Sequence, residues 1–407
     1  MTAMKKLLLL GGSRYLLPVI REAKELGLYT IACDYLPDNI AHRYSDEYHN
    51  VSITDLEATK KLAGDLGVDG VMSFACDPGV VTAAYVAEEL GLPNVGPYES
   101  VCILQDKARF RGFLREHGFR VPGVRSYDSM EAALKEKDSL PWPQMVKPVD
   151  CAGSKGVSRV NGPDELEQAI RDALRYARCG RFLLEDYIEK KGFSSDTDCF
   201  SVDGELRYVS FNNQYFDPQA DNPYAPIGYT WPSTIPQAQQ DELAGEIQRL
   251  LHLLKMKTAL YNIEVRVGTD GNAYLMEVSP RGGGNRLSEM LCYCSGVNLI
   301  RNAVKAAVGL PVEEMHNPVY SGHWSIVMLH AQRDGVFRGL EIAPDARASV
   351  VEEDLWVEPG DPVEAMTGAN KAIGSLVMNW PSEEERDARM QNPAAWLRIL
   401  TEESENA

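Results

Sequence analysis

Two acidic residues near the middle of the chain have a spacing that suits metal chemistry. The apolar runs Leu260–Val267 and Ala273–Val278 flank Asp270-Gly271, a dipeptide typical of a two-residue hairpin turn. If this turn closes, Glu264 lies directly opposite Glu277 on one face of the hairpin. Like charges in that position repel each other, and a divalent cation would reverse the effect. The pattern favours a Mg²⁺ or Mn²⁺ site, with a surface hairpin that carries two solvated acids as the alternative.

The neighbouring residues extend this set of oxygen and nitrogen groups. The same register predicts Asn262 opposite Ser279 on the face of the two glutamates. Arg281 and three consecutive glycines follow, and they offer a guanidinium and accessible backbone N–H groups to anionic oxygens. Mg²⁺ is commonly held by one or two carboxylates together with substrate phosphates. The segment therefore suits a metal–phosphate site.

A lysine and a glycine-containing loop form a second candidate for phosphate binding. Lys147 ends a short apolar strand expected over Gln144–Pro148, where a lysine must meet an anion or keep its head in water. The loop Cys151–Val157 follows with Gly153 and Gly156, and such a loop can fold over phosphates. The alternative is a strand-edge lysine beside an ordinary turn.

Two further features are weak when taken alone. Lys107 opens a helix expected over Lys107–His117, where a solvent-facing position is the simplest interpretation. The expected strand Phe182–Glu185 leads into Asp186-Tyr187-Ile188. The backbone of that segment could pair with a purine edge, and an ordinary strand end fits equally well.

The first hundred residues alternate strands with helices that end at glycine, which predicts a doubly wound parallel sheet. The strands are expected at Leu7–Leu10, Tyr29–Asp34 and Gly70–Phe74, and the helices at Leu16–Leu26, Ile53–Leu66 and Gly79–Leu90. Gly11-Gly12-Ser13 and Cys76-Asp77-Pro78 then lie at the rim where a ligand would bind. Because the full G-x-G-x-x-G spacing is absent, a nicotinamide-dependent dehydrogenase is only a minor alternative.

The rest of the chain mixes helices with antiparallel strands. Helices are expected over Pro163–Tyr176, Gln237–Leu254 and Ser382–Arg389, strands over Trp324–His330 and Ser375–Trp380, and a hairpin over Asp198–Ser210. Asn213–Thr234 is long, with four prolines and five aromatic residues, so it is expected to form an ordered lid or a surface loop.

Composition excludes several classes of protein. The chain has 407 residues, 44% hydrophobic and 25% charged, so two to four ordinary globular domains are expected. The net charge of −18 argues against nucleic acid or an anionic membrane as the main partner. No stretch approaches the roughly 18 apolar residues of a membrane span. The eight cysteines are scattered without a zinc pattern, and without a secretory signal a cytoplasmic location is expected.

Taken in order, these motifs resemble the ATP-grasp superfamily from about Val101 to Leu310. The order is Lys107, Lys147 with its glycine loop, Glu185 to Ile188, Glu264, Glu277 and Arg281. The whole layout, including Glu358–Val363, looks like carboxylate–amine ligases of the bacterial amino-acid ligase type. The resemblance implies an α/β and α+β fold in three parts. They are a doubly wound domain at 1–100, a two-subdomain ATP-grasp domain at 101–315 and a small α+β domain at 316–407.

The resemblance also implies roles for individual residues around an ATP molecule between the two subdomains. Phosphates would meet Lys107 and Lys147 under a loop with Gly153 and Ser154, and adenine would be lined by Glu185, Asp186, Tyr187 and Ile188. The ribose acid is expected at Asp196, with Glu189 as the second candidate. Glu264 and Glu277 would hold two Mg²⁺ ions. Ser279 stands where the family usually has an asparagine, and Asn262 is expected opposite it.

The implied reaction has two steps. ATP phosphorylates a carboxylate, and an amine attacks the acyl phosphate to form an amide, with Arg281 and Lys147 as catalytic groups. Arg281, Gly283 and Arg286 are expected to meet the substrate. The partners are then a small carboxylate and an amine, with no nucleic acid or membrane, and a homodimer is expected. The alternatives are an ATP-grasp carboxylation or purine-pathway enzyme and a nucleotide-binding regulator without turnover.

Overall fold

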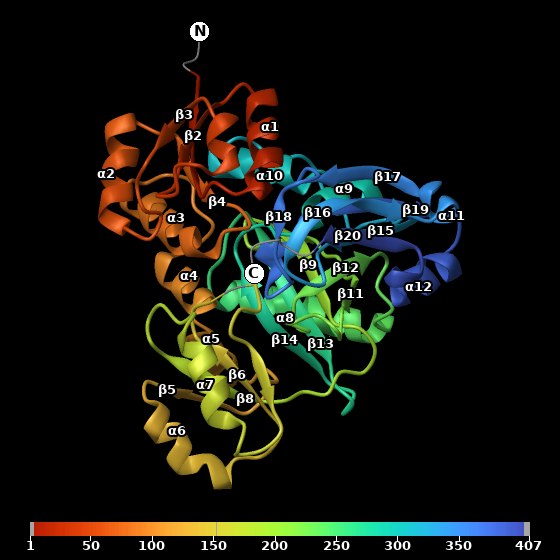
Figure 1. The fold of residues 1–407 in the computed structure, drawn as a ribbon. Helices are drawn as coiled ribbons and strands as arrows, with labels where there is room; N and C mark the ends of the chain where they lie inside the picture. Colours follow the sequence, from red (N-terminus) through yellow and green to blue (C-terminus); the bar gives the residue numbers. More distant parts are fainter. Residues whose placement is uncertain (1–3, 152, 403–407) are drawn as a thin grey trace.

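The N-terminal part of the chain is a parallel sheet with the strand order β3-β2-β1-β4 (Figure 1). The structure is a computed structural model, and it describes residues 4–151 and 153–402. The elements are β1 (Lys6–Leu10), α1 (Leu17–Glu25), β2 (Tyr29–Cys33), β3 (Glu47–His49), α2 (Leu56–Leu66), β4 (Gly70–Ser73) and α3 (Asp77–Glu89). Leu7 and Leu9 of β1 pack on the side of α1, whereas Leu8 and Leu10 pack on the side of α2 and α3. The predicted doubly wound sheet is confirmed.

A second sheet lies below this unit in Figure 1 and has the antiparallel order β5-β8-β6-β7. It is preceded by α4 (Tyr98–Gln105) and α5 (Lys107–Glu116). Its elements are β5 (Val124–Tyr127), α6 (Met130–Glu136), β6 (Gln144–Pro148), β7 (Ser158–Val160), α7 (Leu166–Leu174) and β8 (Phe182–Asp186). Val146, Phe182 and Leu184 pack with α6 and α7 on one face. Lys147 and Glu185, in the alternating positions, therefore lie on the other face.

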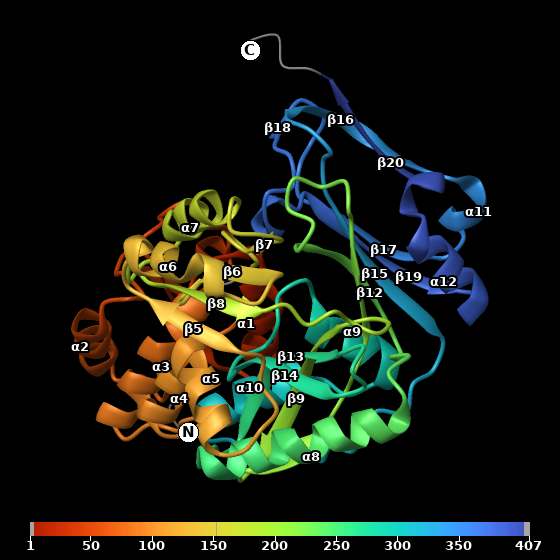
Figure 2. The ribbon, with the colours of Figure 1, turned by 90° about the horizontal axis from the view of Figure 1, so that it is seen from below.

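A third sheet has the antiparallel order β10-β9-β13-β14, with α8 running along it in Figure 2. Its elements are β9 (Ser195–Val202), β10 (Glu205–Tyr208), α8 (Gln237–Leu253), β13 (Ala259–Val267), β14 (Ala273–Ser279), α9 (Leu287–Ser295) and α10 (Leu299–Ala307). Tyr261, Ile263 and Val265 of β13 share a buried core with residues of α8. Because side chains alternate along a strand, Asn262 and Glu264 point away from that core.

The segment expected to be a lid or a surface loop is instead part of a sheet. It forms the hairpin of β11 (Asn213–Phe216) and β12 (Pro226–Thr230), and β12 pairs with β15. The sheet order is β11-β12-β15-β19-β17, so this sheet crosses the expected boundary at residues 315 and 316. The aromatic residues Tyr215 and Tyr229 are buried in it, which explains why this proline-rich segment is ordered.

The remaining C-terminal elements complete this sheet and add a smaller one of order β18-β16-β20. They are β15 (His323–Leu329), β16 (Gly335–Ile342), α11 (Pro344–Arg347), β17 (Val350–Leu355), β18 (Pro362–Val363), β19 (Gly374–Trp380), α12 (Glu383–Gln391) and β20 (Leu397–Glu402). In the part of the chain that the structure describes, no helix is both long and apolar enough to cross a bilayer. The structure has free thiols at Cys33, Cys76, Cys102, Cys179, Cys199, Cys292 and Cys294.

Candidate functional site

The β13–β14 hairpin brings the two predicted glutamates face to face. Glu264 pairs with Glu277 and Asn262 pairs with Ser279, as the sequence predicts. The two glutamate side chains are about one-third exposed, at 34% and 31%. Two like charges on one ladder position are unfavourable without a cation nearby.

The turn of this hairpin differs from the prediction. Val267 pairs with Ala273, and the Gly268 N–H donates to the Asn272 carbonyl, so the loop between Gly268 and Asn272 has three residues rather than two. Gly271 has a φ of +80°, the left-handed conformation that ends a three-residue hairpin loop of this kind. The predicted two-residue turn at Asp270-Gly271 is therefore wrong.

A β-bulge restores the predicted pairing farther from the turn. Val265 pairs with Leu275. Glu264, one residue farther from the turn, pairs with Glu277, so Met276 is the extra residue of β14. Leu275 belongs to the core beneath the sheet. Without the bulge Glu277 would share that buried face, since it lies two residues from Leu275. The bulge thus turns Glu277 to the same face as Glu264.

Lys107 contacts Glu277 from the start of α5. Asp106 caps this helix by accepting the Arg109 N–H, which makes Lys107 the first helical residue. Its Nζ lies 3.1 Å from Glu277 Oε2 and donates to the Cys151 carbonyl at 3.0 Å. Burial alone would lower the pKa of Lys107, but the Glu277 carboxylate outweighs it and the pKa is raised. The lysine therefore stays charged beside the hairpin.

One helical turn later, Arg111 reaches the second predicted lysine site. Its Nε donates to Glu185 Oε2 at 2.9 Å, and Lys147 Nζ lies 2.5 Å from Glu185 Oε1. Although burial acts in the opposite direction, Arg111 and Lys147 lower the pKa of Glu185 to about 2. Because residues four apart lie on one helix face, α5 carries two cations that join β14 to the sheet of β6 and β8.

The segment expected to line adenine is hydrogen-bonded to its surroundings. The N–H groups of Asp186 and Tyr187 donate to the carbonyls of Gly123 and Pro143. The Glu185 carboxylate is paired with Arg111 and Lys147. Arg159 lies 4.2 Å above the Tyr187 ring, and Arg266 donates to the Ile188 carbonyl at 3.4 Å. All of these residues except Glu185 are partly exposed, so they form a surface next to the strand end.

The predicted phosphate loop is fastened to the β11–β12 hairpin. Gly153 and Ser154 have φ angles of +70° and +57°. Ser154 Oγ donates to the Tyr224 carbonyl at 2.9 Å, and Asn222 Nδ2 donates to the Ser154 carbonyl at 3.0 Å. Ala152, within the predicted loop Cys151–Val157, lies outside the described residues. The loop and the connection between β11 and β12 are thus in contact.

Two aspartates of β9 lie beside the hairpin. Asp196 is opposite Glu264 on the neighbouring strand and accepts hydrogen bonds from Asn262 Nδ2 at 2.7 Å and the Tyr229 hydroxyl at 3.1 Å. Burial, followed by repulsion from Glu264, raises its pKa to about 7. A cation at Glu264 would therefore also favour the charged form of Asp196.

Asp198 fastens the glycine run to the same strand, a role the sequence reasoning missed. It accepts the Gly283 N–H at 2.9 and 3.1 Å and a hydrogen bond from Ser288 Oγ. A Cβ on Gly283 would lie 2.8 Å from Asp198 Oδ1, so only glycine allows this approach. The N–H of Gly283, predicted for substrate, is already used. Burial raises the pKa of Asp198 to about 6.

Arg281 forms a buried ion pair with the N-terminal unit. Its Nε and Nη2 donate to the two oxygens of Asp77 at 3.0 and 2.9 Å. Ser279 Oγ also donates to Asp77 at 3.0 Å and accepts from Gln105 Nε2 at 2.7 Å. Burial would raise the pKa of Asp77, but Arg281 outweighs it and holds the pKa below the usual value. Ser279, predicted as a metal ligand, has no exposed surface.

Arg286, predicted to meet the substrate, has protein partners. Its Nη2 lies 3.1 Å from Glu289 Oε1 and 2.9 Å from Glu352 Oε2, and its Nη1 donates to Ser375 Oγ at 3.2 Å. Burial would lower its pKa, but the two glutamates raise it. These contacts tie the start of α9 to the C-terminal sheet.

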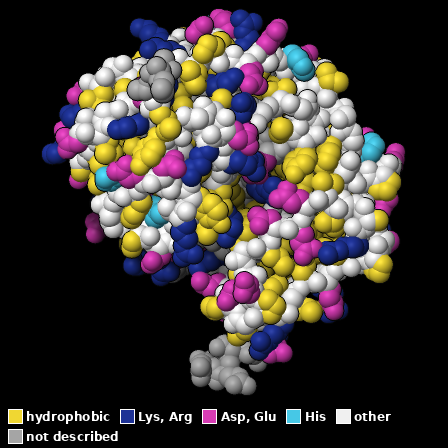
Figure 3. Space-filling view, turned by 90° about the horizontal axis from the view of Figure 1, so that it is seen from above, with side chains coloured by type: hydrophobic (Ala, Val, Ile, Leu, Met, Phe, Trp, Pro, Cys, Tyr) yellow, Lys and Arg dark blue, Asp and Glu magenta, His cyan; other side chains and the backbone are white. Residues whose placement is uncertain are grey.

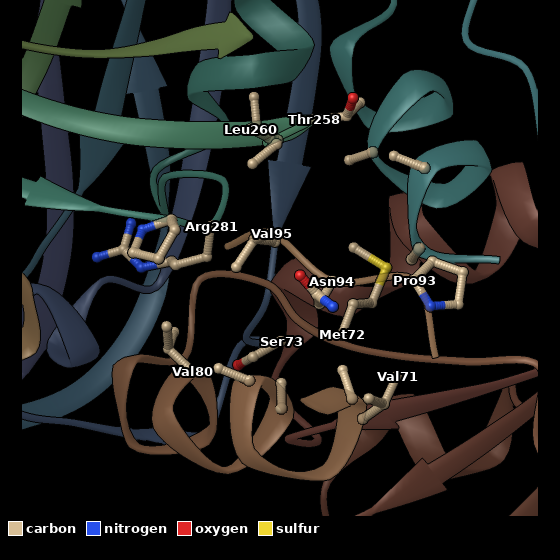
Figure 4. Close-up of a pocket in the computed structure, with 18 of the residues that line it drawn as sticks. Val71, Met72, Ser73, Val80, Pro93, Asn94, Val95, Thr258, Leu260 and Arg281 are labelled. Carbon is tan, nitrogen blue, oxygen red and sulfur yellow. The ribbon is translucent and has the colours of Figure 1, made fainter. Parts of the chain in front are cut away.

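Two cavities lie near the candidate site. A cavity of about 320 Å³ is lined by charged groups that include Asp77, Lys107 and Glu277, together with residues of α2, α3 and α4. A smaller, mostly apolar cavity of about 60 Å³ has Arg281 at one end and Pro93 at the other (Figure 4). Figure 3 shows a hollow near the middle of the upper face, with acidic and basic side chains gathered at its edge. Of the predicted site residues, Lys107 and Glu277 line the polar cavity, and Arg281 lines the apolar one.

The donor set fits Mg²⁺ only with help from a ligand. Among residues 4–151 and 153–402, no cluster of three or more His, Cys, Asp or Glu side chains is arranged to hold a metal ion. Glu264 and Glu277 supply two hard carboxylate oxygens on one face. Mg²⁺ needs six oxygens and often takes several from water and substrate phosphates. The hairpin thus suits a metal that arrives with a phosphate compound.

Comparisons with known proteins agree with this architecture. Residues 140–289 match the family described as ATP-grasp domain. The carbamoyl phosphate synthase large chain of Ralstonia nicotianae is 24% identical over 271 residues, 65% of this chain and 23% of that protein. The chain spans about a quarter of the length of the curated relatives it matches.

Two solved structures cover almost the whole chain. The L-amino acid ligase from Bacillus licheniformis has a TM-score of 0.80 at 20% identity, over 99% of this chain and 100% of that one. The biotin carboxylase domain of the Hydrogenobacter thermophilus 2-oxoglutarate carboxylase, in complex with MgADP, ADP and bicarbonate, has a TM-score of 0.74. It is 17% identical over 98% of this chain and 92% of that one. Residues 140–289 thus match the ATP-grasp domain, and the chain as a whole shares the fold of these two structures.

Proposed function

We propose that the protein is an ATP-dependent ligase that joins a small carboxylate to an amine and releases ADP and phosphate. The observation that carries this proposal is the pairing of Glu264 with Glu277, with Lys107 Nζ 3.1 Å from Glu277. Two carboxylates for Mg²⁺ beside a lysine for phosphate are what phosphoryl transfer needs. Lys147 and Arg281 add two further cations near the ends of the same two sheets.

The reaction would proceed by two displacements. A carboxylate oxygen of the first substrate attacks the γ-phosphorus of ATP, and the bond to the ADP oxygen breaks. The amine nitrogen of the second substrate then attacks the carbonyl carbon, phosphate leaves, and the nitrogen loses its proton to water. Charge stabilisation is the main demand of the first step, which is consistent with the cations that the candidate site holds.

The residues of the chain would divide this work. Bound Mg²⁺ at Glu264 and Glu277 would neutralise charge on the phosphate oxygens. Lys107 would hold a phosphate next to it, and the remaining N–H groups of Arg281 would meet the transferred phosphoryl group. Lys147 would share its charge between Glu185 and a phosphate. Ser279 lies between Gln105 and Asp77, so we assign it to holding the hairpin end in place.

The nucleotide and substrate contacts stay predictions. We keep the loop with Gly153 and Ser154 as the cover over the phosphates, and the partly exposed segment Asp186–Ile188 for adenine. Asp196 is kept for ribose, and its place beside Glu264 also suits a contact to metal-bound water. The Arg286 side chain and the Gly283 N–H already have protein partners. These two residues would therefore affect substrate binding by fixing the conformation of the loop, without a direct hydrogen bond to substrate.

The names of the relatives support this class of reaction and also its alternative. An L-amino acid ligase and a biotin carboxylase domain with bicarbonate share the fold at similar TM-scores. Carboxylation would use bicarbonate as the carboxylate in the same first step. Stimulation of ADP release by bicarbonate alone would favour that alternative over amide formation.

The experiment is a screen of ADP release by the purified protein with ATP and Mg²⁺. Pairs of carboxylates and amines, with amino acids in both roles, are tested with mass detection of the product. The proposal expects ADP release that requires both partners and a product mass equal to their sum less one water. Full ADP release without any carboxylate or amine, or no ADP release with any pair, would contradict the proposal.

Two expectations about the working form of the protein also belong here. The seven free thiols named above suit a reducing compartment, so we infer a cytoplasmic location. We also expect a homodimer, which light scattering on the purified protein would test.

A further inference from the structure

One ion pair of the candidate site crosses from the N-terminal sheet unit to the hairpin loop. Asp77 is the first residue of α3, four residues after the carboxyl end of β4, and Arg281 follows β14. Their side chains are only 15% and 8% exposed. A charged pair this deeply buried is retained only where the geometry is good and the remaining groups are satisfied.

The contacts of Asp77 leave little freedom to the arginine. Asp77 takes Nε and Nη2 of Arg281 side-on, and Nη1 donates to the Gly282 carbonyl at 3.1 Å. A guanidinium has five N–H donors. The described contacts use three of them, so two donors remain, on Nη1 and Nη2. They form the end of the guanidinium that a second oxyanion can meet in a fork geometry.

Asp77 also fixes the strand end next to the metal-binding glutamate. It accepts from Ser279 Oγ at 3.0 Å, two residues after Glu277, and Ser279 accepts from Gln105 Nε2. The position at the start of α3 favours a negative charge, because the positive end of the helix dipole lies there. One carboxylate of the N-terminal unit thus holds both the arginine and the end of β14.

We propose that Asp77 is a positioning residue that holds Arg281 with its two remaining N–H donors facing the transferred phosphoryl group. The inference rests on the proposed function and assigns to the N-terminal unit a part in the transfer step. An arginine held on one side by a carboxylate loses less side-chain freedom in the transition state. Without Asp77, ADP would bind as before, but the transferred phosphoryl group would lose part of its stabilisation.

The test is Asp77→Asn, which keeps the shape and removes the charge. We expect kcat to fall about 10- to 100-fold, with the KM for ATP changed less than about threefold. Calorimetry should give an unchanged Kd for MgADP, whereas the tighter binding of MgADP with aluminium fluoride, a mimic of the phosphoryl group in transfer, should be lost. If Asp77→Asn does not fold, Asp77→Glu keeps the charge, moves it by one methylene and should also lower kcat.

Glu22→Gln is the matched control. Glu22 is 6% exposed and pairs with Arg301 at 3.1 Å, again between the N-terminal sheet unit and a later helix, but away from the candidate site. It should lower the thermal midpoint without changing kcat. Unchanged kcat and aluminium fluoride binding in a folded Asp77 variant would overturn the inference. Failure of the wild-type protein to bind MgADP would instead contradict the proposed function.

Discussion

Glu264 and Glu277 face each other across the β13–β14 ladder because a bulge at Met276 turns Glu277 out of the core. The same hairpin face meets Lys107, whose Nζ is 3.1 Å from Glu277 Oε2. The lysine offsets one of the two negative charges, and Glu264 is left with Arg266 at 3.9 Å. The local charge balance therefore leaves room for a divalent cation between the two carboxylates.

Glu277→Gln should abolish ATP turnover without unfolding the protein. The change removes the charge that we propose binds Mg²⁺ but keeps the shape and the strand pairing, so we expect a loss of about 100-fold or more in kcat. ADP release and circular dichroism are measured together. Glu341→Gln on β16, at a side chain that is 57% exposed, is the control and should keep full activity. Normal turnover in Glu277→Gln would refute the metal assignment.

The buried acid Glu185 should make stability depend on pH below about 4.5. Its pKa is about 2 in the folded protein and 4.5 in its unperturbed state, so the carboxylate stabilises the fold above that range. The contribution, about 3 kcal/mol, should be lost as the pH falls from about 4.5 to about 2. Urea unfolding of the wild type and Glu185→Gln at several pH values measures it.

In that experiment the gap in unfolding free energy between the two proteins should shrink as the solution becomes acidic. Glu242→Gln, at the surface pair with Arg120, is the control and should keep the pH dependence of the wild type. A gap between wild type and Glu185→Gln that stays constant from about pH 6 to about pH 3 would contradict this account of Glu185.

The glycine run after Arg281 should tolerate a methyl group at one position and reject it at another. A Cβ on Gly282 would lie 2.1 Å from Cε2 of the buried Phe74, whereas a Cβ on Gly284 would be 3.7 Å from its nearest neighbour. Gly282→Ala should lower the unfolding free energy by about 1–3 kcal/mol, and Gly284→Ala by no more than about 0.5 kcal/mol. Equal thermal midpoints for the two variants would show that the loop repacks freely.

Lys107→Met should weaken ATP binding more than it weakens the fold. The lysine charge next to Glu277 and the Cys151 carbonyl is expected to meet a phosphate, so the KM for ATP should rise about tenfold or more. Lys5→Met, at a half-exposed lysine near Asp69, is the control. Steady-state kinetics measure the KM for ATP of both variants. Equal values would contradict a contact between Lys107 and ATP.

Much of the fold could be predicted because its elements are periodic and clearly bounded. The strand Gln144–Pro148 has the predicted bounds, and the N-terminal strands and helices lie within three residues of them. The short β3 was missed because three partly exposed residues carry no clear alternation. The sequence predicts a lid or a loop over Asn213–Thr234 because the strands there are short and the burial of their hairpin depends on β15, a hundred residues later.

Local strand register and the order of the motifs predict only those parts of the site that depend on neighbouring residues. The predicted pairing of Glu264 with Glu277 is confirmed, although the loop is one residue longer than expected and a bulge adds one residue to β14. The role of Asp77 depends on how α3 packs on the β14 end, which no local pattern contains. Arg111 lies four residues after Lys107, and that helical spacing is a signal that could have placed it.

The most direct test of the account is a crystal structure of the protein with MgADP. The account predicts a Mg²⁺ ion about 2.1 Å from carboxylate oxygens of both Glu264 and Glu277, with a phosphate oxygen of ADP completing its coordination beside Lys107. A nucleotide bound away from the β13–β14 hairpin, or a metal ion that contacts neither glutamate, would contradict it.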